Sequence, residues 1–230
     1  MLVSVIIPTH NRIDQLQKSV ISVFRQTVLP GEIIIVDDGS SSPVIESIFD
    51  DAPDSTNCIL VRNEMSQGGG AARNKGAALA KGKYLAFLDD DDLWRTEKLA
   101  LQLDLMASED LDLCYTGKTI IAVDESGNEL SRRYSFARPK FNDLKKSIMR
   151  QNFIGTTSSI LVKKSSFELV SGFDKSMPAL QDYEFYIRCK DSNGNIAPQS
   201  FVMEVCVDDG PDTQAPEILG TNYDEESYIE

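Results

Sequence analysis

Four consecutive aspartates, Asp89 to Asp92, carry the strongest chemical signal in this sequence of 230 residues. They follow the apolar run YLAFL and lead directly into Leu93 and Trp94. Because adjacent carboxylates repel each other, we expect a positively charged partner among them. The alternative is a solvated turn in which Asp92 caps a helix that begins at Leu93. A turn alone, however, does not need this concentration of charge after a buried strand.

Two other polar stretches, PTHNR and DDGSS, also follow apolar runs. Asp37 and Asp38 in the second stretch could simply form a turn before Gly39, because Asp, Gly and Ser are ordinary turn residues. If the apolar runs are parallel strands, however, all three polar ends meet at the ligand crevice of the sheet. His10 is the only histidine, and without a partner at metal-site spacing we interpret it as a structural or pocket-edge residue.

The elements that would position these residues alternate between strand and helix. Near-continuous apolar segments predict buried strands at residues 2–8, 32–38, 58–63 and 83–89. An amphipathic helix with Asn11 as its N-cap, a short helix at 44–49 and an alanine-rich helix after GGG lie between them. This order predicts an α/β fold with a doubly wound, mostly parallel sheet that is covered by helices on both faces.

The net charge of −13 is concentrated after residue 190, where ten acidic residues and no basic one occur. The nearly neutral remainder has no clustered basic face, which argues against nucleic acid as a partner. We therefore predict one domain over residues 1–189 and an acidic tail over 190–230 that is partly strand-like, around Phe201 to Val207, or disordered. No segment has the length or flanks of a membrane span or signal peptide, so a cytoplasmic location is expected.

Six stretches in order resemble the successive motifs of family 2 glycosyltransferases and together cover residues 2–188: VSVIIPTHNR, IIIVDDGSSS, GGGAARNKG, YLAFLDDDDLW, TTSSILVKKSSFELVSGFD and QDYEFYIR. One such motif would be weak, but six in the family's order are specific. The resemblance implies a GT-A fold and inverting transfer of a sugar from a nucleoside diphosphate, with a UDP-sugar as the expected donor. It also implies a glycan or lipid-linked acceptor, a Mn²⁺ or Mg²⁺ ion, and a role in surface polysaccharide or glycan synthesis. Peripheral association with the inner face of the membrane, and the oligomeric state, stay open.

The same resemblance implies roles for individual residues. Donor binding is expected from Pro8, Thr9, Asn11, Asp38, Arg73 and Asp89. Within that set, Asp38 would accept a hydrogen bond from the base and Arg73 would pair with a phosphate. Asp91 is the expected metal ligand, and Asp90 is the variable middle position of the motif. Asp182 in QDYEF is the expected general base, with a helix cap as its alternative role and with Tyr183 and Glu184 shaping the acceptor side.

The chain departs from the family after Arg188, where the usual further helix, strand and acceptor-covering loop are not recognisable. Residues 190–230 instead resemble the edge of an extracellular β-sandwich module, although they are too few to form one. Two alternatives therefore stay open: a relative that binds nucleotide sugars with impaired catalysis, and a sugar nucleotidyltransferase. The second typically has a glycine-rich basic loop after its first strand, and PTHNRIDQ lacks it. A dinucleotide oxidoreductase is disfavoured because no GxGxxG follows that strand.

Overall fold

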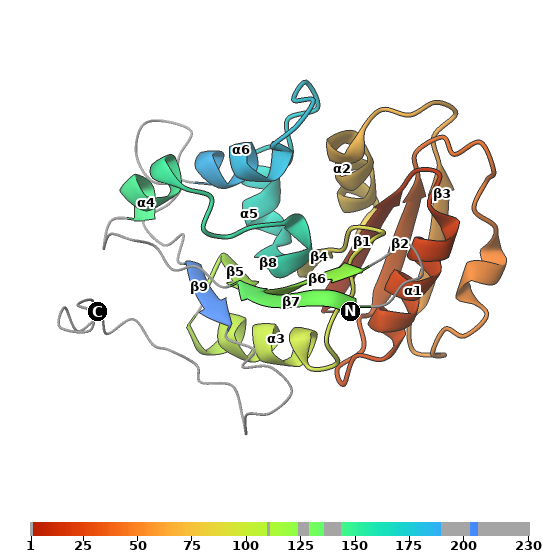
Figure 1. The fold of residues 1–230 in the computed structure, drawn as a ribbon, viewed down its shortest axis with the longest axis horizontal. Coiled ribbons are helices and arrows are strands. Elements are labelled where there is room, and N and C mark those ends of the chain that lie inside the picture. Colours follow the sequence, from red (N-terminus) through yellow and green to blue (C-terminus); the bar gives the residue numbers. More distant parts are fainter. Residues whose placement is uncertain (1, 110, 124–128, 136–143, 190–202, 207–230) are drawn as a thin grey trace.

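The computed structural model describes residues 2–109, 111–123, 129–135, 144–189 and 203–206. Its main sheet has seven strands in the order β3-β2-β1-β4-β8-β5-β9 (Figure 1). These strands are β1 (Val3–Thr9), β2 (Glu32–Asp37), β3 (Asn57–Arg62), β4 (Tyr84–Phe87), β5 (Leu113–Thr116), β8 (Ile160–Lys163) and β9 (Met203–Cys206). A separate two-stranded sheet pairs β6 (Lys118–Val123) with β7 (Glu129–Ser135).

The predicted doubly wound and mostly parallel sheet is confirmed in its first half. Strands β1, β2, β3 and β4 are parallel, while β8 runs antiparallel to both β4 and β5. The chain proceeds from β1 outward to β3 and then returns to the other side of β1 to form β4. The order therefore reverses between β1 and β4, and the ligand crevice of such a sheet lies at the carboxyl ends of these two strands.

Helices cover both faces of the sheet, as predicted (Figure 1). They are α1 (Ile13–Phe24), α2 (Gly69–Leu79), α3 (Lys98–Ser108), α4 (Leu144–Arg150), α5 (Lys164–Leu169) and α6 (Gln181–Arg188), with short 3-10 turns η1 (Glu46–Phe49) and η2 (Thr157–Ser159). Helices α1 and α3 pack on the face that contains Val5 and Ile7 of β1. Helices α2, α5 and α6 pack on the opposite face with Ile6. The alternation of strand side chains thus buries both faces of β1.

Two predicted helix caps are wrong. The cap position of α1 belongs to Arg12, and Asn11 has a left-handed φ of 57° and bonds elsewhere. No helix begins at Leu93 either, because α3 starts only at Lys98. The intervening chain is held by tertiary contacts, since Trp94 Nε1 donates to the Ser158 carbonyl at 2.9 Å. These contacts favour an extended path over a helix at this point.

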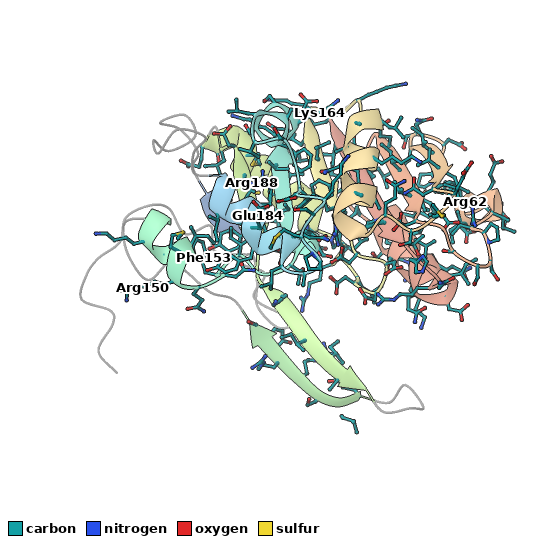
Figure 2. The ribbon with its side chains drawn as sticks, turned by 90° about the horizontal axis from the view of Figure 1, so that it is seen from above. Arg62, Arg150, Phe153, Lys164, Glu184 and Arg188 are labelled. Carbon is teal, nitrogen blue, oxygen red and sulfur yellow. The ribbon has the colours of Figure 1, made fainter. Side chains whose placement is uncertain are left out.

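The β6–β7 hairpin has no counterpart among the predicted elements. It extends away from the body of the molecule, as the view from above shows (Figure 2). Its side chains include four exposed large apolar or aromatic residues: Ile120, Ile121, Leu130 and Tyr134. An isolated two-stranded hairpin is marginally stable in water, so contacts with neighbouring elements must help to hold it.

In the acidic tail, the predicted strand near residues 201–207 corresponds to β9, which pairs in parallel with β5. The remaining predictions for the tail, including its resemblance to a β-sandwich edge, lie outside the described residues. Among the helices that the structure describes, none combines the length and apolar character that a membrane crossing requires.

Candidate functional site

The acidic motif lies at the reversal point of the sheet and is tied to the end of β1. Thr9 Oγ1 donates to Asp90 Oδ2 at 2.7 Å across the gap between β1 and β4. The Ser19 hydroxyl of α1 lies 2.9 Å and 2.7 Å from the main-chain oxygens of Asp90 and Asp92. The sheet and α1 therefore fix the path of the loop on which all four carboxylates sit.

The expected positive charge among the aspartates is confirmed. Arg12 Nη1 lies 2.7 Å from Asp91 Oδ2 and 3.2 Å from Asp90 Oδ1. The charges of these two carboxylates raise the pKa of Arg12 above its ordinary value. Arg73 on α2 forms an ion pair with Asp89, and its predicted contact with a phosphate stays a prediction. Arg12 received no predicted role, although it stands in the PTHNR motif.

The aspartates of the motif differ sharply in environment. Asp90 is only 5% exposed and binds Thr9 and Arg12, while its interpretation as the variable middle position of the motif stays a prediction. Asp91, by contrast, has a side chain that is 52% exposed at the crevice. Burial raises the pKa of Asp92, and the hydrogen bond from Ser158 opposes that effect. Asp90 is therefore a structural group and Asp91 the accessible one.

The segment before β8 orients the motif from the other side. Thr157 Oγ1 donates to Asp89 Oδ1 at 3.0 Å, and the Asp89 main-chain N–H donates to Ser158 Oγ at 2.9 Å. The TTSS letters were part of the resemblance, but no role was predicted for either residue. Their hydroxyls hold Asp89 so that its carboxylate faces Arg73 as well as the crevice.

Asp182 lies in the first turn of α6 and is half-buried. Asn152 Nδ2 is 3.4 Å from Asp182 Oδ2 and 3.1 Å from the Gly155 carbonyl, so one amide links α6 to the loop before η2. The cap position of α6 belongs to Leu180, and the alternative interpretation of Asp182 as the helix cap is therefore wrong. Asn152 is a site residue that sequence reasoning missed.

The two residues that follow Asp182 both form contacts within the protein. The Tyr183 hydroxyl donates to the Ile148 carbonyl at 2.6 Å. Glu184 is occupied by Arg188, one turn later on the same helix, and the two side chains lie together in Figure 2. Tyr183 therefore ties α6 to α4, whereas Glu184 pairs within α6, and their contribution to the acceptor side stays a prediction.

A buried tyrosine connects Asp182 with the acidic motif. The Tyr186 hydroxyl donates to the Thr156 carbonyl at 3.2 Å, directly before the residue that binds Asp89. Burial raises the pKa of Tyr186 well above its ordinary value, and the nearby charges of Asp182 and Asp89 raise it further. Asn152 binds both Asp182 and the Gly155 carbonyl, two residues before Thr157, so hydrogen bonds bring the two predicted clusters together.

Asp38 is enclosed by the loop that follows β3. Its carboxylate accepts hydrogen bonds from Asn63, Ser66 and the main-chain N–H groups of Gln67 and Gly68, at 2.6–3.0 Å. Burial alone would raise the pKa of Asp38, but these donors outweigh it and hold the pKa below its ordinary value. The carboxylate fixes this loop, and its contact with a base stays a prediction.

The remaining predicted donor residues lie beside Asp38. Pro8 is buried in β1, opposite Val36 of β2. The Asn11 side-chain oxygen accepts from Ser41 N at 2.8 Å. His10 Nδ1 lies 2.9 Å from the Asp38 carbonyl, to which it donates, which supports the structural interpretation of this histidine. The structure thus places these residues together at one strand edge.

The carboxylates of Asp89 and Asp91 are hard oxygen donors of the kind that Mg²⁺ and Mn²⁺ prefer. Within the described residues, no group of three or more His, Cys, Asp or Glu side chains is arranged to hold a metal alone. Mg²⁺ is commonly bound by one or two carboxylates together with substrate phosphates. The residues therefore fit a metal that binds with a diphosphate, in competition with Arg12 and Arg73 for the same oxygens.

The model of the family "Glycosyl transferase family 2" matches residues 4–170. An uncharacterized glycosyltransferase of Methanocaldococcus jannaschii is 32% identical over 191 residues, which cover 82% of this chain and 64% of that protein. The Escherichia coli UDP-Glc:alpha-D-GlcNAc-diphosphoundecaprenol beta-1,3-glucosyltransferase WfgD is 32% identical over 52% of this chain and 47% of its own length. The structure of S. aureus TarS in complex with UDP-GlcNAc has a TM-score of 0.62 at 19% identity, over 82% of this chain and 53% of that one. The chain thus spans less than two thirds of these proteins.

Proposed function

The chain belongs to glycosyltransferase family 2, and from this membership we propose that it transfers a sugar from a nucleoside-diphosphate donor to an acceptor hydroxyl with inversion at the anomeric carbon. The observation that carries the proposal is the set of contacts that joins Asp182, through Asn152 and the loop at residues 155–157, to Asp89. Such an arrangement puts a candidate base and a candidate diphosphate site on one crevice.

Each group has a defined task in this reaction. Asp182 takes the proton of the acceptor hydroxyl while that oxygen forms the new bond to the anomeric carbon. The bond from this carbon to the diphosphate breaks in the same displacement, so the configuration inverts. Arg73, already at the crevice, is positioned to pair with the departing diphosphate once a donor is bound. Asn152 orients Asp182 from the loop before η2.

We further propose a divalent metal, Mn²⁺ or Mg²⁺, held by Asp91 directly and by Asp89 directly or through water. A bound metal would supply positive charge that stabilises the leaving diphosphate. Support for this proposal comes from the chemistry of the two carboxylates and from the exposure of Asp91, whose side chain is 52% accessible. Asp90 is unsuited to the task because it is only 5% exposed and accepts a hydrogen bond from Thr9.

For the donor we propose a UDP-sugar whose nucleoside lies beside Asp38. A cavity of about 380 Å³ borders this position and is lined by Arg62 to Gln67 and by Lys75. The names of two similar proteins support the donor class, because WfgD uses UDP-Glc and the TarS structure contains UDP-GlcNAc.

For the acceptor we propose a lipid-linked glycan in polysaccharide synthesis, by analogy with the diphosphoundecaprenol acceptor in the name of WfgD. A long isoprenoid chain partitions into a bilayer, so we place the protein in the cytoplasm at the membrane's inner face.

The proposal is tested by calorimetric titration of UDP in the presence of Mg²⁺, Mn²⁺ or EDTA. We expect metal-dependent binding to the wild-type protein and its loss in Asp91→Asn, with an unchanged fold. Metal-dependent affinity that survives in the variant would refute the role of Asp91. Incubation with UDP-sugars then separates two of the alternatives, because a transferase releases UDP and an impaired relative binds without release. A nucleotidyltransferase is tested in a separate incubation with a nucleoside triphosphate and a sugar 1-phosphate, from which it would release pyrophosphate.

A further inference from the structure

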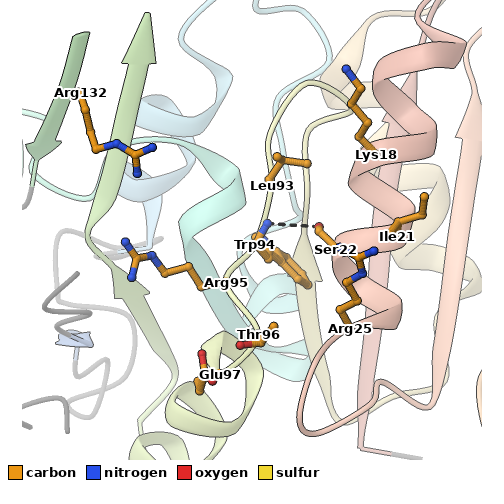
Figure 3. Close-up of a pocket in the computed structure, with 10 residues that line it drawn as sticks. All are labelled: Lys18, Ile21, Ser22, Arg25, Leu93, Trp94, Arg95, Thr96, Glu97 and Arg132. Atoms are coloured by element: carbon orange, nitrogen blue, oxygen red, sulfur yellow. Dashed lines mark hydrogen bonds between the residues drawn. The ribbon is translucent and has the colours of Figure 1, made fainter. Parts of the chain in front are cut away.

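A cavity of about 640 Å³ lies between α1, the 93–97 segment and the β6–β7 hairpin, apart from the residues of the proposed reaction (Figure 3). Lys18 and Arg25 line it from α1, while Arg95 and Arg132 line it from the opposite side. Glu97 is the one acidic residue among the lining residues. We call this cavity the basic groove, and its charge suits an anion.

Lys18 and Arg25 are available to a ligand in this groove. Both side chains are exposed, and neither forms an ion pair with another described residue. Arg132 already binds Glu129 through two hydrogen bonds, at 2.9 Å and 2.7 Å, and is therefore less available to a ligand than Lys18 and Arg25. Lys18 and Arg25 are seven residues apart on α1, which places them on one face and separates them by about 10 Å along the axis. This spacing suits an extended anion better than a single small one.

The groove also offers apolar contact. Leu93 is 64% exposed at its rim, and Ile21 of α1 is half-exposed between the two basic residues. A ligand that combines phosphate groups with a hydrocarbon chain would satisfy both features, whereas a purely ionic ligand would leave the apolar rim unused.

The segment that lines the basic groove directly follows the acidic motif in the chain. Leu93 follows Asp92 directly in the chain. The Trp94 main-chain N–H donates to Ser22 of α1, and its indole donates to the Ser158 carbonyl of the segment that orients Asp89. A molecule lying along α1 would therefore have one end at the crevice where the reaction is proposed to occur.

We propose that the basic groove binds the diphosphate and the first isoprenoid units of the lipid-linked acceptor, and so presents the acceptor's sugar to Asp182. This inference rests on the proposed function and specifies where its acceptor is held. Lys18 and Arg25 pair with the phosphates, and Leu93 and Ile21 contact the hydrocarbon chain.

The test uses farnesyl diphosphate, a water-soluble isoprenoid diphosphate, as the probe. Trp94 is the only tryptophan of the sequence and lines the groove, so its fluorescence reports on occupancy. Binding is measured both without and with UDP and Mg²⁺, because UDP would displace a probe that is bound at the donor site. We expect saturable binding to the full chain that weakens as salt is added, because exposed charges are screened.

Two double variants, each lacking two positive charges, distinguish binding in the groove from nonspecific attraction to the protein's overall charge. Lys18→Gln/Arg25→Gln should lower the probe's affinity by about tenfold or more, since two charge-assisted contacts are lost. Lys81→Gln/Lys83→Gln removes the same charge from exposed side chains outside the groove and should retain the wild-type affinity. Thermal unfolding of all three proteins checks that the fold is unchanged.

Four results would overturn the inference: no saturable binding to the wild-type protein, equal affinity in the groove variant, an equal loss in both double variants, or displacement of the probe by UDP. Binding to phosphatidylglycerol vesicles without binding to the probe would assign the groove to a membrane surface instead. Release of UDP from UDP-sugars by the wild-type protein is measured separately. That result tests the proposed function, so its failure is distinguishable from failure of the groove.

Discussion

Replacing Asp90 with alanine separates the structural from the accessible aspartate of the motif. The change removes the acceptor of the Thr9 hydroxyl, which is 4% exposed and bonded to Asp90 at 2.7 Å. A buried hydroxyl left without a partner costs about 1–3 kcal/mol. Loss of the half-exposed Arg12 pair adds about 0–1 kcal/mol, and relief of the buried carboxylate's desolvation offsets part of the total. We expect a net loss of about 2 kcal/mol in the free energy of unfolding.

Urea denaturation measures this loss as a decrease of about 1 M in the unfolding midpoint, if the free energy of unfolding falls by about 2 kcal/mol per molar urea. Asp91→Ala is the matched control, because it removes a neighbouring carboxylate whose ion pair with Arg12 is half-exposed on both sides. Its cost should stay below about 1 kcal/mol. A wild-type midpoint for Asp90→Ala, or equal losses in the two variants, would refute the division of roles within the motif.

Three further outcomes follow from particular contacts. The pKa of Asp38 is held low in the folded protein, so its ionised form stabilises the fold above about pH 4 and that stability is lost as the pH falls through the folded-state pKa. In Asp38→Asn, the urea midpoint should therefore fall less steeply than in the wild-type protein as the pH is lowered below about 4. An equally steep fall in both proteins would contradict a stabilising role of the Asp38 carboxylate. Gly172→Ala should lower the free energy of unfolding by about 2–4 kcal/mol, because φ at this position is +63° and the added Cβ would lie 2.5 Å from Asn74 Oδ1. An unchanged melting temperature would contradict this expectation. Burial raises the pKa of Asp92 and the nearby charge of Lys118 lowers it, so Lys118→Met should raise that pKa further in a carboxyl-carbon NMR titration; an unchanged pKa would show that the charge of Lys118 does not act on Asp92.

The first half of the fold was predictable because its strands are buried on both faces. Continuous apolar runs such as LVSVIIP leave little choice of element, and the helices between them impose parallel pairing. The hairpin and the antiparallel β8 were not predictable in the same way. Their pairing depends on contacts between distant segments, and a short apolar run such as ILVK does not specify the direction of its neighbour.

The site was predictable as a location but not as a set of contacts. Polar residues at three strand ends were correctly expected to converge, and the aspartates were correctly expected to have a positive partner. Four identical side chains in a row, however, carry no information about which is buried. That distinction depends on Thr9, which donates a hydrogen bond to Asp90, and on Thr157, which donates one to Asp89. Both are hydroxyl contacts between segments far apart in the sequence.

The central claim, that this crevice transfers sugar with Asp182 as the base, is tested most directly in Asp182→Asn. Asparagine keeps the size of the side chain but cannot take a proton, and Asp174→Asn serves as a control because that carboxylate is exposed and bonds to Ser176 in a nearby turn. UDP release from the UDP-sugar that binds best, and the affinity for UDP, are measured in the same preparations. We predict release that is slower by about 10²- to 10⁴-fold in Asp182→Asn alone, with UDP affinity unchanged in both variants. Undiminished release, or a parallel loss of UDP affinity, would contradict the assignment.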